Sequence, residues 1–278
     1  DLFLSLETTL EDCPEQLRSD DEIVLAALEQ DGFNLEFTSD EVKNNRAFVM
    51  TAVQSGYLDG RECGLALEYA SETLRADKEV VLAAVEADVA ALQFASDALR
   101  SDEEIVMKAV LLWEEYCEES RGGYPYNVYD EEDFPVEYAH PSLKCNQVFL
   151  AKVLRNMEQP TEIRSLISLV VNTDFSNREK VLKRIYHNRY FLGYTPEALR
   201  ADREAVLIAV QQRGGDLKYA SEKLQGDKEV VLAALNNDWS ALKYASEKLQ
   251  GDKEVVLAVV KDCGGALQYA SEELKGDK

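Results

Sequence analysis

Apolar residues recur along most of the chain at intervals of three and four, the period of an α-helix that is buried on one face. The stretch after Asp77 shows the pattern, with apolar residues at Val80, Val81, Ala84 and Val85. This spacing predicts a helix with a single buried stripe.

The pattern repeats with an offset of 25 residues. An aspartate opens each copy, at Asp202, Asp227, Asp252 and Asp277, and again at Asp77 and 25 residues later. The segments between these aspartates repeat as well: 217–224, 242–249 and 267–274 all match Leu-x-Tyr-Ala-Ser-Glu-x-Leu. Asparagines take the place of the aspartate at 45 and 177, and a divergent copy lies around 143–153. Such periodicity is typical of repeat proteins.

The recurring aspartate has a physical role at the start of a helix. Its carboxylate accepts a hydrogen bond from a free N–H of the first turn, and its charge suits the positive end of the helix dipole. We therefore predict that six aspartates are structural helix caps: Asp20, Asp77, Asp102, Asp202, Asp227 and Asp252.

Each unit of 25 residues is predicted to be a helical hairpin. After a stop at polar or glycine residues, such as Gly214 and Gly215, a shorter second helix follows, and in the Asp77 copy Ser96 is expected to interrupt it and cap its last turn. One hairpin cannot bury its own stripe, so neighbours must stack on it. The sequence thus predicts an all-α protein, an α-solenoid of about ten such units, in which the repeated Tyr, Phe, Leu and Val are core residues.

The repeated Asp-[Lys/Arg]-Glu-Val-Val-Leu-x-Ala followed by Ala-Leu-x-[Tyr/Phe]-Ala-Ser-Glu-x-Leu resembles the domain of unknown function 4116 repeat family. The resemblance covers nearly the whole chain except its middle. The family has no established enzymatic activity, so the resemblance implies an interaction scaffold and assigns no catalytic residues.

The largest break in the repeat runs from residue 114 to residue 140 and contains the pair Gly122-Gly123 and the prolines 125 and 135, which rule out one continuous helix. We therefore divide the chain into N-terminal repeats (1–113), an irregular acidic, tyrosine-rich insert (114–142) and C-terminal repeats (143–278).

Tyrosines beside carboxylates suit a partner surface, because a tyrosine offers a large contact area at little cost in entropy. The candidate partner-binding residues of the insert are Tyr124, Tyr126, Tyr129, Asp130, Glu131, Glu132, Asp133 and Phe134. The alternative is a solvated loop whose rings fold back on the solenoid.

With 53 acidic and 30 basic side chains, the chain has a formal net charge of -23. This charge disfavours nucleic acid and anionic lipid and favours protein partners with a basic surface. No apolar run approaches the ~20 residues of a membrane helix, which argues against membrane insertion. The five scattered cysteines, without a C-x-x-C pair, indicate an intracellular, reducing compartment, either the cytoplasm or the interior of an organelle.

Motifs of phosphate-binding loops, dinucleotide sites, zinc proteases and serine hydrolases are all missing from the sequence. We expect no catalytic residues, no metal and no cofactor; Cys145 paired in space with His140 or His187 is the remaining enzymatic alternative. The leading hypothesis is a non-enzymatic protein-protein interaction scaffold. The alternatives are a constitutive structural subunit of a larger assembly, such as one in an organelle, and an acidic inhibitor or effector that blocks a basic site. The sequence leaves the oligomeric state open.

Overall fold

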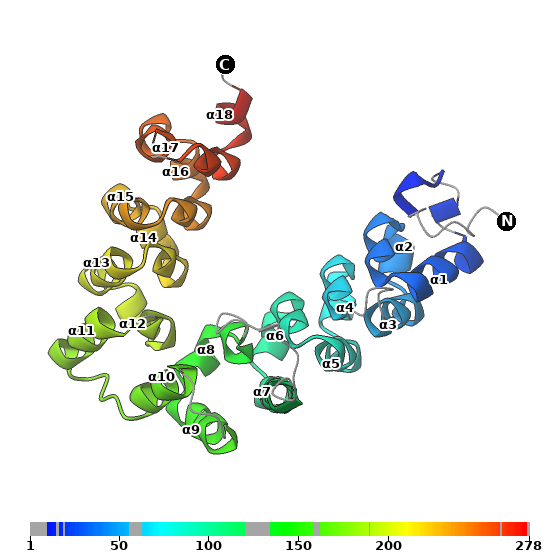
Figure 1. The fold of residues 1–278 in the computed structure, drawn as a ribbon, viewed down its shortest axis with the longest axis horizontal. Helices are drawn as coiled ribbons and strands as arrows, with labels where there is room; N and C mark the ends of the chain where they lie inside the picture. Colours follow the sequence, from blue (N-terminus) through cyan, green and yellow to red (C-terminus); the bar gives the residue numbers. More distant parts are fainter. Residues whose placement is uncertain are drawn as a thin grey trace. The chain divides into compact units, whose positions relative to one another are not determined.

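The computed structural model of the chain describes residues 10–14, 17–18, 20–55, 63–119, 134–157, 162–188, 190–261 and 263–276. All regular elements of these residues are α-helices or 3₁₀-helices (η), and no strand occurs among them (Figure 1). The predicted fold class, an all-α repeat solenoid, is confirmed. Within the described residues no helix is long and apolar enough to span a bilayer.

The helices follow one another in a regular order. From the first to the middle of the chain they are η1 (Leu10–Asp12), α1 (Asp21–Gln30), η3 (Gly32–Phe37), α2 (Asp40–Lys43), α3 (Arg46–Gln54), η4 (Gly64–Tyr69), α4 (Glu72–Arg75), α5 (Lys78–Ala87), η5 (Val89–Phe94), α6 (Asp97–Arg100), α7 (Glu103–Glu119), η8 (Pro135–Glu137), α8 (Pro141–Lys144) and α9 (Gln147–Asn156). The remainder are α10 (Glu162–Val171), α11 (Arg178–His187), η9 (Phe191–Tyr194), α12 (Glu197–Arg200), α13 (Arg203–Gln212), η10 (Gly214–Tyr219), α14 (Glu222–Gln225), α15 (Lys228–Asn237), η11 (Trp239–Tyr244), α16 (Glu247–Gln250), α17 (Lys253–Val260), η12 (Gly264–Tyr269) and α18 (Glu272–Gly276).

The repeating unit has three helical pieces rather than the two of the predicted hairpin. In the copy that opens at Asp77, a ten-residue α-helix (α5) is followed by a six-residue 3₁₀-helix (η5) and a single α-turn (α6). Asp88 separates the first two pieces because its backbone is extended (φ -148°, ψ 118°) and its side chain caps η5 by accepting from the N–H of Ala90. The interruption of the second helix that was expected at Ser96 is confirmed, because Ala95 and Ser96 separate η5 from α6.

The predicted buried stripe is confirmed, since Val80, Val81, Ala84 and Val85 are all fully buried. Full burial of such a side chain contributes about 1.5–3 kcal/mol for valine or leucine, which makes this stripe the main stabilising feature of each unit. The prediction for Ser96 is wrong in one respect. Its hydroxyl makes no capping hydrogen bond; instead its backbone N–H donates to the carbonyl of Arg75 in the preceding repeat at 2.9 Å.

The boundaries predicted for the insert are too wide on both sides. Helix α7 continues to Glu119, because residues 114–119 contain four glutamates and no glycine or proline, and the first glycine comes only at Gly122. On the other side, η8 and α8 are the closing pieces of a regular unit: His140 N–H donates to the carbonyl of Arg100 at 2.9 Å, as Ser96 does to Arg75. Residues 134–142 therefore belong to the repeat.

The chain divides into two compact units. Unit 1 comprises Asp1–Leu143 and Lys152–Ile163, and unit 2 comprises Lys144–Ala151 and Arg164–Lys278. Each one stacks its long helices on their sequence neighbours and its 3₁₀-helices on theirs, for example α3 on α5 in unit 1 and α13 on α15 in unit 2. Both units thus use the same packing of one repeat on the next.

Candidate protein-interaction surface

Most of the predicted partner-binding residues lie outside the described residues: Tyr124, Tyr126, Tyr129, Asp130, Glu131, Glu132 and Asp133. Phe134 is described, and the prediction for it is corrected. Its side chain is fully buried, and its ring packs edge-on against Trp113 with the centroids 5.1 Å apart. Phe134 is therefore a core residue of unit 1.

The six predicted caps all lie at helix N-termini and accept hydrogen bonds from the first turn. Asp20 accepts from the N–H of Ile23 at 3.2 Å. The other five each accept two N–H groups, as Asp77 does from Glu79 at 2.9 Å and Val80 at 3.2 Å. The asparagines of the divergent copies cap in the same way: Asn45, Asn146 and Asn177.

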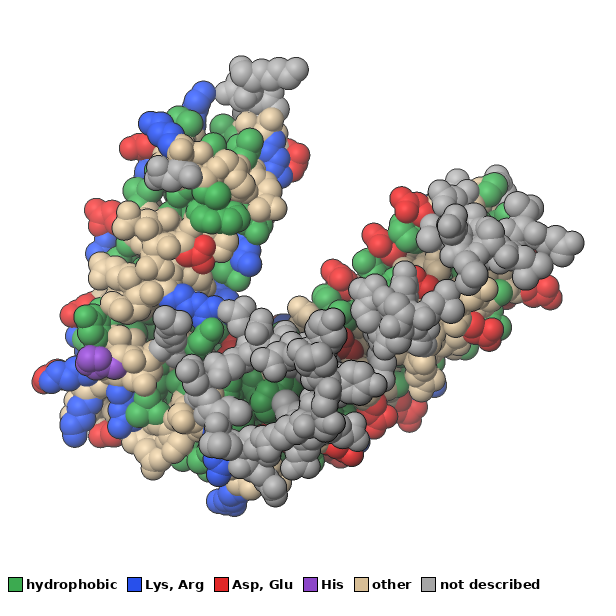
Figure 2. Space-filling view, in the orientation of Figure 1, with side chains coloured by type: hydrophobic (Ala, Val, Ile, Leu, Met, Phe, Trp, Pro, Cys, Tyr) green, Lys and Arg blue, Asp and Glu red, His purple; other side chains and the backbone are tan. Residues whose placement is uncertain are grey.

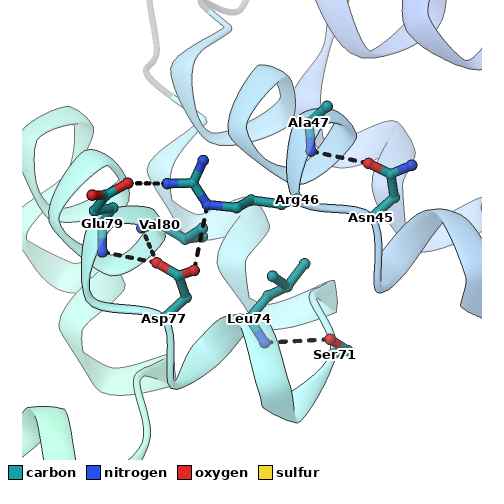
Figure 3. A network of polar contacts seen from close by, with 8 residues as sticks. All are labelled: Asn45, Arg46, Ala47, Ser71, Leu74, Asp77, Glu79 and Val80. Carbon is teal, nitrogen blue, oxygen red and sulfur yellow. Dashed lines mark hydrogen bonds and ion pairs between the residues drawn. The ribbon is translucent and has the colours of Figure 1, made fainter.

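The first residue of a long helix reaches the cap of the next repeat. Figure 3 shows the arrangement in unit 1, where the Arg46 guanidinium bonds both to Asp77, at 3.4 Å, and to Glu79. Four further joints have the same geometry: Lys78 with Asp102 and Glu104, Arg178 with Asp202 and Glu204, Arg203 with Asp227 and Glu229, and Lys228 with Asp252 and Glu254. We call this contact the basic clamp.

Each clamp is weak because its side chains are partly exposed, and exposed ion pairs contribute about 0–1 kcal/mol. Their value is geometric: the basic residue contacts two carboxylates of one turn, which fixes how far one repeat is displaced along the next. Partial burial would raise the pKa of Asp77, but the N–H groups of Val80 and Glu79 and the charge of Arg46 outweigh it and lower that pKa. Hydrogen bonds to Glu104 and Asp102 raise the pKa of Lys78.

The clamp predicts a pH-dependent contribution to stability. Burial opposes ionisation of Asp227, yet the N–H of Val230 and the Arg203 side chain lower its pKa below the unfolded value of about 3.9. A lowered pKa stabilises the fold above the unfolded pKa, and that contribution is lost as the pH falls through the folded value. Asn is an equally good cap that does not titrate. We expect Asp227→Asn to lower the free energy of unfolding by about 0.5–1 kcal/mol at pH 7, and this difference should shrink as the pH falls below the unfolded pKa and through the lowered folded pKa of Asp227.

Urea unfolding of both proteins at pH 7, 5, 4 and 2.5 measures this difference. The comparison cancels the effect of changing overall charge, because both proteins share every other carboxylate. A gap that is equally large at pH 7 and pH 2.5 would contradict the clamp.

A second contact between repeats is made by the backbone. The N–H of the residue that precedes a short α-turn donates to the last carbonyl of the previous short turn. The bonds are Ser71 to Lys43, Ser96 to Arg75, His140 to Arg100, Ser221 to Arg200, Ser246 to Gln225 and Ser271 to Gln250, at 2.9–3.1 Å. These bonds join backbone groups of half-buried residues and form only when the neighbouring repeat is in place.

Glycine allows the closest approach of one long helix to the previous repeat. A Cβ on Gly64 would lie 2.5 Å from the carbonyl oxygen of Ala84, and a Cβ on Gly214 would overlap that of Ala234. Some copies carry a side chain at this position, as Val89 and Trp239 do. Beside Trp239 a cavity of about 430 Å³ opens, lined in part by residues of α15 and α17.

The 3₁₀-helices carry two rows of exposed polar side chains, each beside a row of aromatic rings. The acidic row of unit 1 is Glu36, Glu68 and Gln93, followed in sequence by the rings of Phe37, Tyr69 and Phe94. The basic row of unit 2 is Lys218, Lys243 and Gln268, followed by Tyr219, Tyr244 and Tyr269. All six row residues are exposed; the rings are half-buried, apart from the buried Tyr219.

The rings and the charges within a row lie close together. Partial burial and the carboxylates of Glu36 and Glu68 raise the pKa of Tyr69, so this ring lies near carboxylates of two successive repeats. In the basic row, Lys218 Nζ lies 4.8 Å from the centroid of Tyr219, and Lys243 Nζ lies 4.8 Å from that of Tyr244. Each row therefore offers charge and aromatic surface together, and the stacking of the 3₁₀-helices sets its spacing.

Charge is distributed unevenly along the chain. Residues 1–143 hold 34 acidic and 9 basic side chains, whereas residues 144–278 hold 19 and 21, so the formal charges of the two parts are -25 and +2. Figure 2 shows acidic side chains along α1 to α5, and basic side chains are more frequent along α11 to α17. The excess negative charge thus belongs to the part of the chain that carries the acidic row.

An acid-aromatic surface was predicted from the sequence on the insert; apart from Phe134 this surface lies outside the described residues, and the rows were not identified. The sequence does contain the pattern of the rows, since the residue before the repeated aromatic residue is Glu in the first two copies and Lys in two later ones. This pattern was overlooked because the aromatic residue was assigned wholly to the core.

The two histidines that the sequence analysis considered as partners of Cys145 contact other side chains. His140 Nδ1 lies 2.8 Å from Ser142 Oγ, and the His187 ring packs edge-on against Tyr186.

The comparisons agree with the repeat register. The model of a domain of unknown function (DUF4116) matches residues 7–43, 20–59, 61–97, 177–225, 202–250 and 252–278, which together make up well over half of the chain. The unmatched stretch between residues 97 and 177 contains α7, α9 and α10, where the helices depart from the regular unit. No curated protein and no solved structure matches the chain.

Proposed function

Because the chain belongs to the family of the domain of unknown function DUF4116, we propose that it is a non-enzymatic scaffold that binds a protein partner with a basic surface. The observation that carries the proposal is the acidic row, Glu36, Glu68 and Gln93, which unit 1 presents beside half-buried rings. The formal charge of -25 on residues 1–143 supports a basic partner, since such a field attracts cationic segments and speeds their association.

The spacing of the row favours an extended segment. Packed helices lie about 8–10 Å apart, and three residues of a polyproline II segment span about 9 Å. A partner with a lysine or arginine at every third residue would therefore place one cation opposite each repeat. The intervening residues of such a segment would contact the rings of Phe37, Tyr69 and Phe94, which gives the row both charge and apolar contact area.

The test is a fluorescence anisotropy titration with a labelled 15-residue peptide that has lysine at every third position. Glu36→Gln combined with Glu68→Gln is expected to weaken binding about tenfold, since two exposed ion pairs contribute roughly 1.4 kcal/mol together. The matched control is Glu222→Gln with Glu247→Gln, two exposed carboxylates on short turns of unit 2 that change the net charge equally.

Equal weakening by both pairs would contradict the proposal, because it would mean that net charge alone attracts the peptide. A peptide with the same lysines clustered at one end should bind less tightly than the spaced one.

Purification of the native protein as a free species, rather than as part of an assembly, distinguishes this scaffold from the alternative of a constitutive structural subunit.

A further inference from the structure

We propose that the basic row, Lys218, Lys243 and Gln268, docks on the acidic row of a second copy of this chain. The two rows occupy the same register position of the repeat, immediately before the conserved aromatic residue. Read in chain order they are Glu, Glu, Gln and Lys, Lys, Gln. When the two rows are aligned in chain order, the two glutamates of the acidic row face the two lysines of the basic row, and the two glutamines face each other.

The spacing of the two rows is matched because one structural unit builds both. Each row residue lies on one of three successive 3₁₀-helices: η3, η4 and η5 for the acidic row, and η10, η11 and η12 for the basic row. Within each set, neighbouring 3₁₀-helices stack on one another. Two rows with the same repeat can bring several charge pairs together in one docking event, which a partner with irregular charges cannot.

All six row residues are exposed, so docking requires no rearrangement of the repeats. The rings beside them supply the contact area that charges alone lack. Tyr69 in the acidic row and Tyr244 in the basic row are half-buried, with one part of each ring accessible. Aromatic rings whose bodies are fixed by packing lose little entropy in a contact and are common anchors of interfaces.

A second copy is favoured by charge even though the chain carries a net charge of -23. The basic row belongs to the part of the chain with a formal charge of +2, so the surface that approaches the acidic row is not itself anionic. When each copy offers both rows, the smallest closed assembly is a two-fold dimer in which each acidic row meets the basic row of the other copy. The inference does not depend on the scaffold function, because it concerns contacts between identical chains.

The experiment is sedimentation velocity on the full chain between about 5 and 200 μM. The wild-type protein is expected to dimerise. Glu36→Lys with Glu68→Lys, and separately Lys218→Glu with Lys243→Glu, should each weaken dimerisation at least tenfold. The first pair changes the net charge to -19 and the second to -27. An effect of net charge alone would move the two variants in opposite directions, whereas loss of the contact weakens both.

Mixing the two variants is the decisive experiment. The glutamate-to-lysine variant has two basic rows and the lysine-to-glutamate variant has two acidic rows. The mixture should therefore form a heterodimer with an affinity within about threefold of wild type, while each variant alone stays monomeric. Glu222→Lys with Glu247→Lys, which also gives a net charge of -19, should leave the affinity within twofold. Far-UV circular dichroism and thermal unfolding confirm that every variant is folded.

A wild-type chain that is monomeric throughout the range overturns the inference, and so does a mixture that fails to associate. Association of either charge-reversed variant with wild-type affinity overturns it as well. The peptide titration separates the two proposals, because Lys218→Gln with Lys243→Gln removes the cations of the basic row without creating a second acidic row, so it should weaken self-association and leave binding of the spaced lysine peptide to the acidic row intact.

Discussion

Replacing Gly214 by alanine is expected to lower the free energy of unfolding by about 2–4 kcal/mol. The new Cβ would overlap the carbonyl oxygen of Ala234 and lie 2.8 Å from Cβ of Asp238, and both neighbours belong to the next repeat. The contacted oxygen is part of the backbone of α15, so it cannot move aside without displacing the helix. The loss should appear in urea unfolding followed by circular dichroism.

Gly226→Ala is the matched control in the same unit. The atoms nearest to its Cβ would be 3.6 Å away, an ordinary contact distance, and Gly226 has a right-handed backbone (φ -94°, ψ -1°) that alanine adopts readily. We expect its stability to be unchanged or raised by up to about 1 kcal/mol, because alanine reduces the entropy of the unfolded chain. Equal destabilisation by both substitutions would contradict the close joint at Gly214.

The parts of the fold that depend on local chemistry could be predicted from the sequence. A carboxylate at a helix start and apolar residues at a period of 3.6 act within a few residues, so Asp77 and the stripe that begins at Val80 were identified directly. The register was equally accessible because the repeat is nearly perfect in the last copies. These observations sufficed to predict an all-α solenoid.

The parts that depend on the neighbouring repeat could not be predicted. A six-residue 3₁₀-helix and an α-helix bury apolar residues at similar spacings, so η5 was not distinguished from an α-helix. Ser96 looks like a cap in the sequence, but the preceding repeat supplies a carbonyl for its N–H. The extension of α7 into the predicted insert follows from the lack of a helix breaker before Gly122, which the repeat spacing concealed.

Acidic residues beside aromatic rings were predicted from the sequence to bind a basic partner at Tyr124–Asp133, because that segment interrupts the repeat, and this prediction lies outside the described residues. The acidic row is a further candidate surface that belongs to the repeat itself. It becomes visible only when Glu36 and Glu68 are seen on neighbouring 3₁₀-helices. Sequence separation hides such a row, since its members are more than 24 residues apart.

Deleting one whole repeat tests most directly the central claim that equivalent units stack through equivalent joints. Removal of residues 227–251 joins Gly226 to Asp252, so Arg203 would meet Asp252 and Glu254 in place of Asp227 and Glu229. The clamp, the cap and the backbone bond between repeats are all restored by the next unit. In a quasi-one-dimensional array the shortened chain should fold cooperatively, with the same ellipticity per residue and a Tm within about 10 °C of wild type.

The control deletion removes residues 227–238 only, which takes away α15 and leaves η11 facing the wrong repeat. We expect this chain to lose the helical signal of the repeats beyond residue 226, although it lacks fewer residues than the first. Far-UV circular dichroism with thermal unfolding of the two chains measures the difference. A folded in-register deletion beside a partly unfolded out-of-register one is the predicted result. Comparable loss of structure in both would contradict the account, because the repeats would then not be interchangeable.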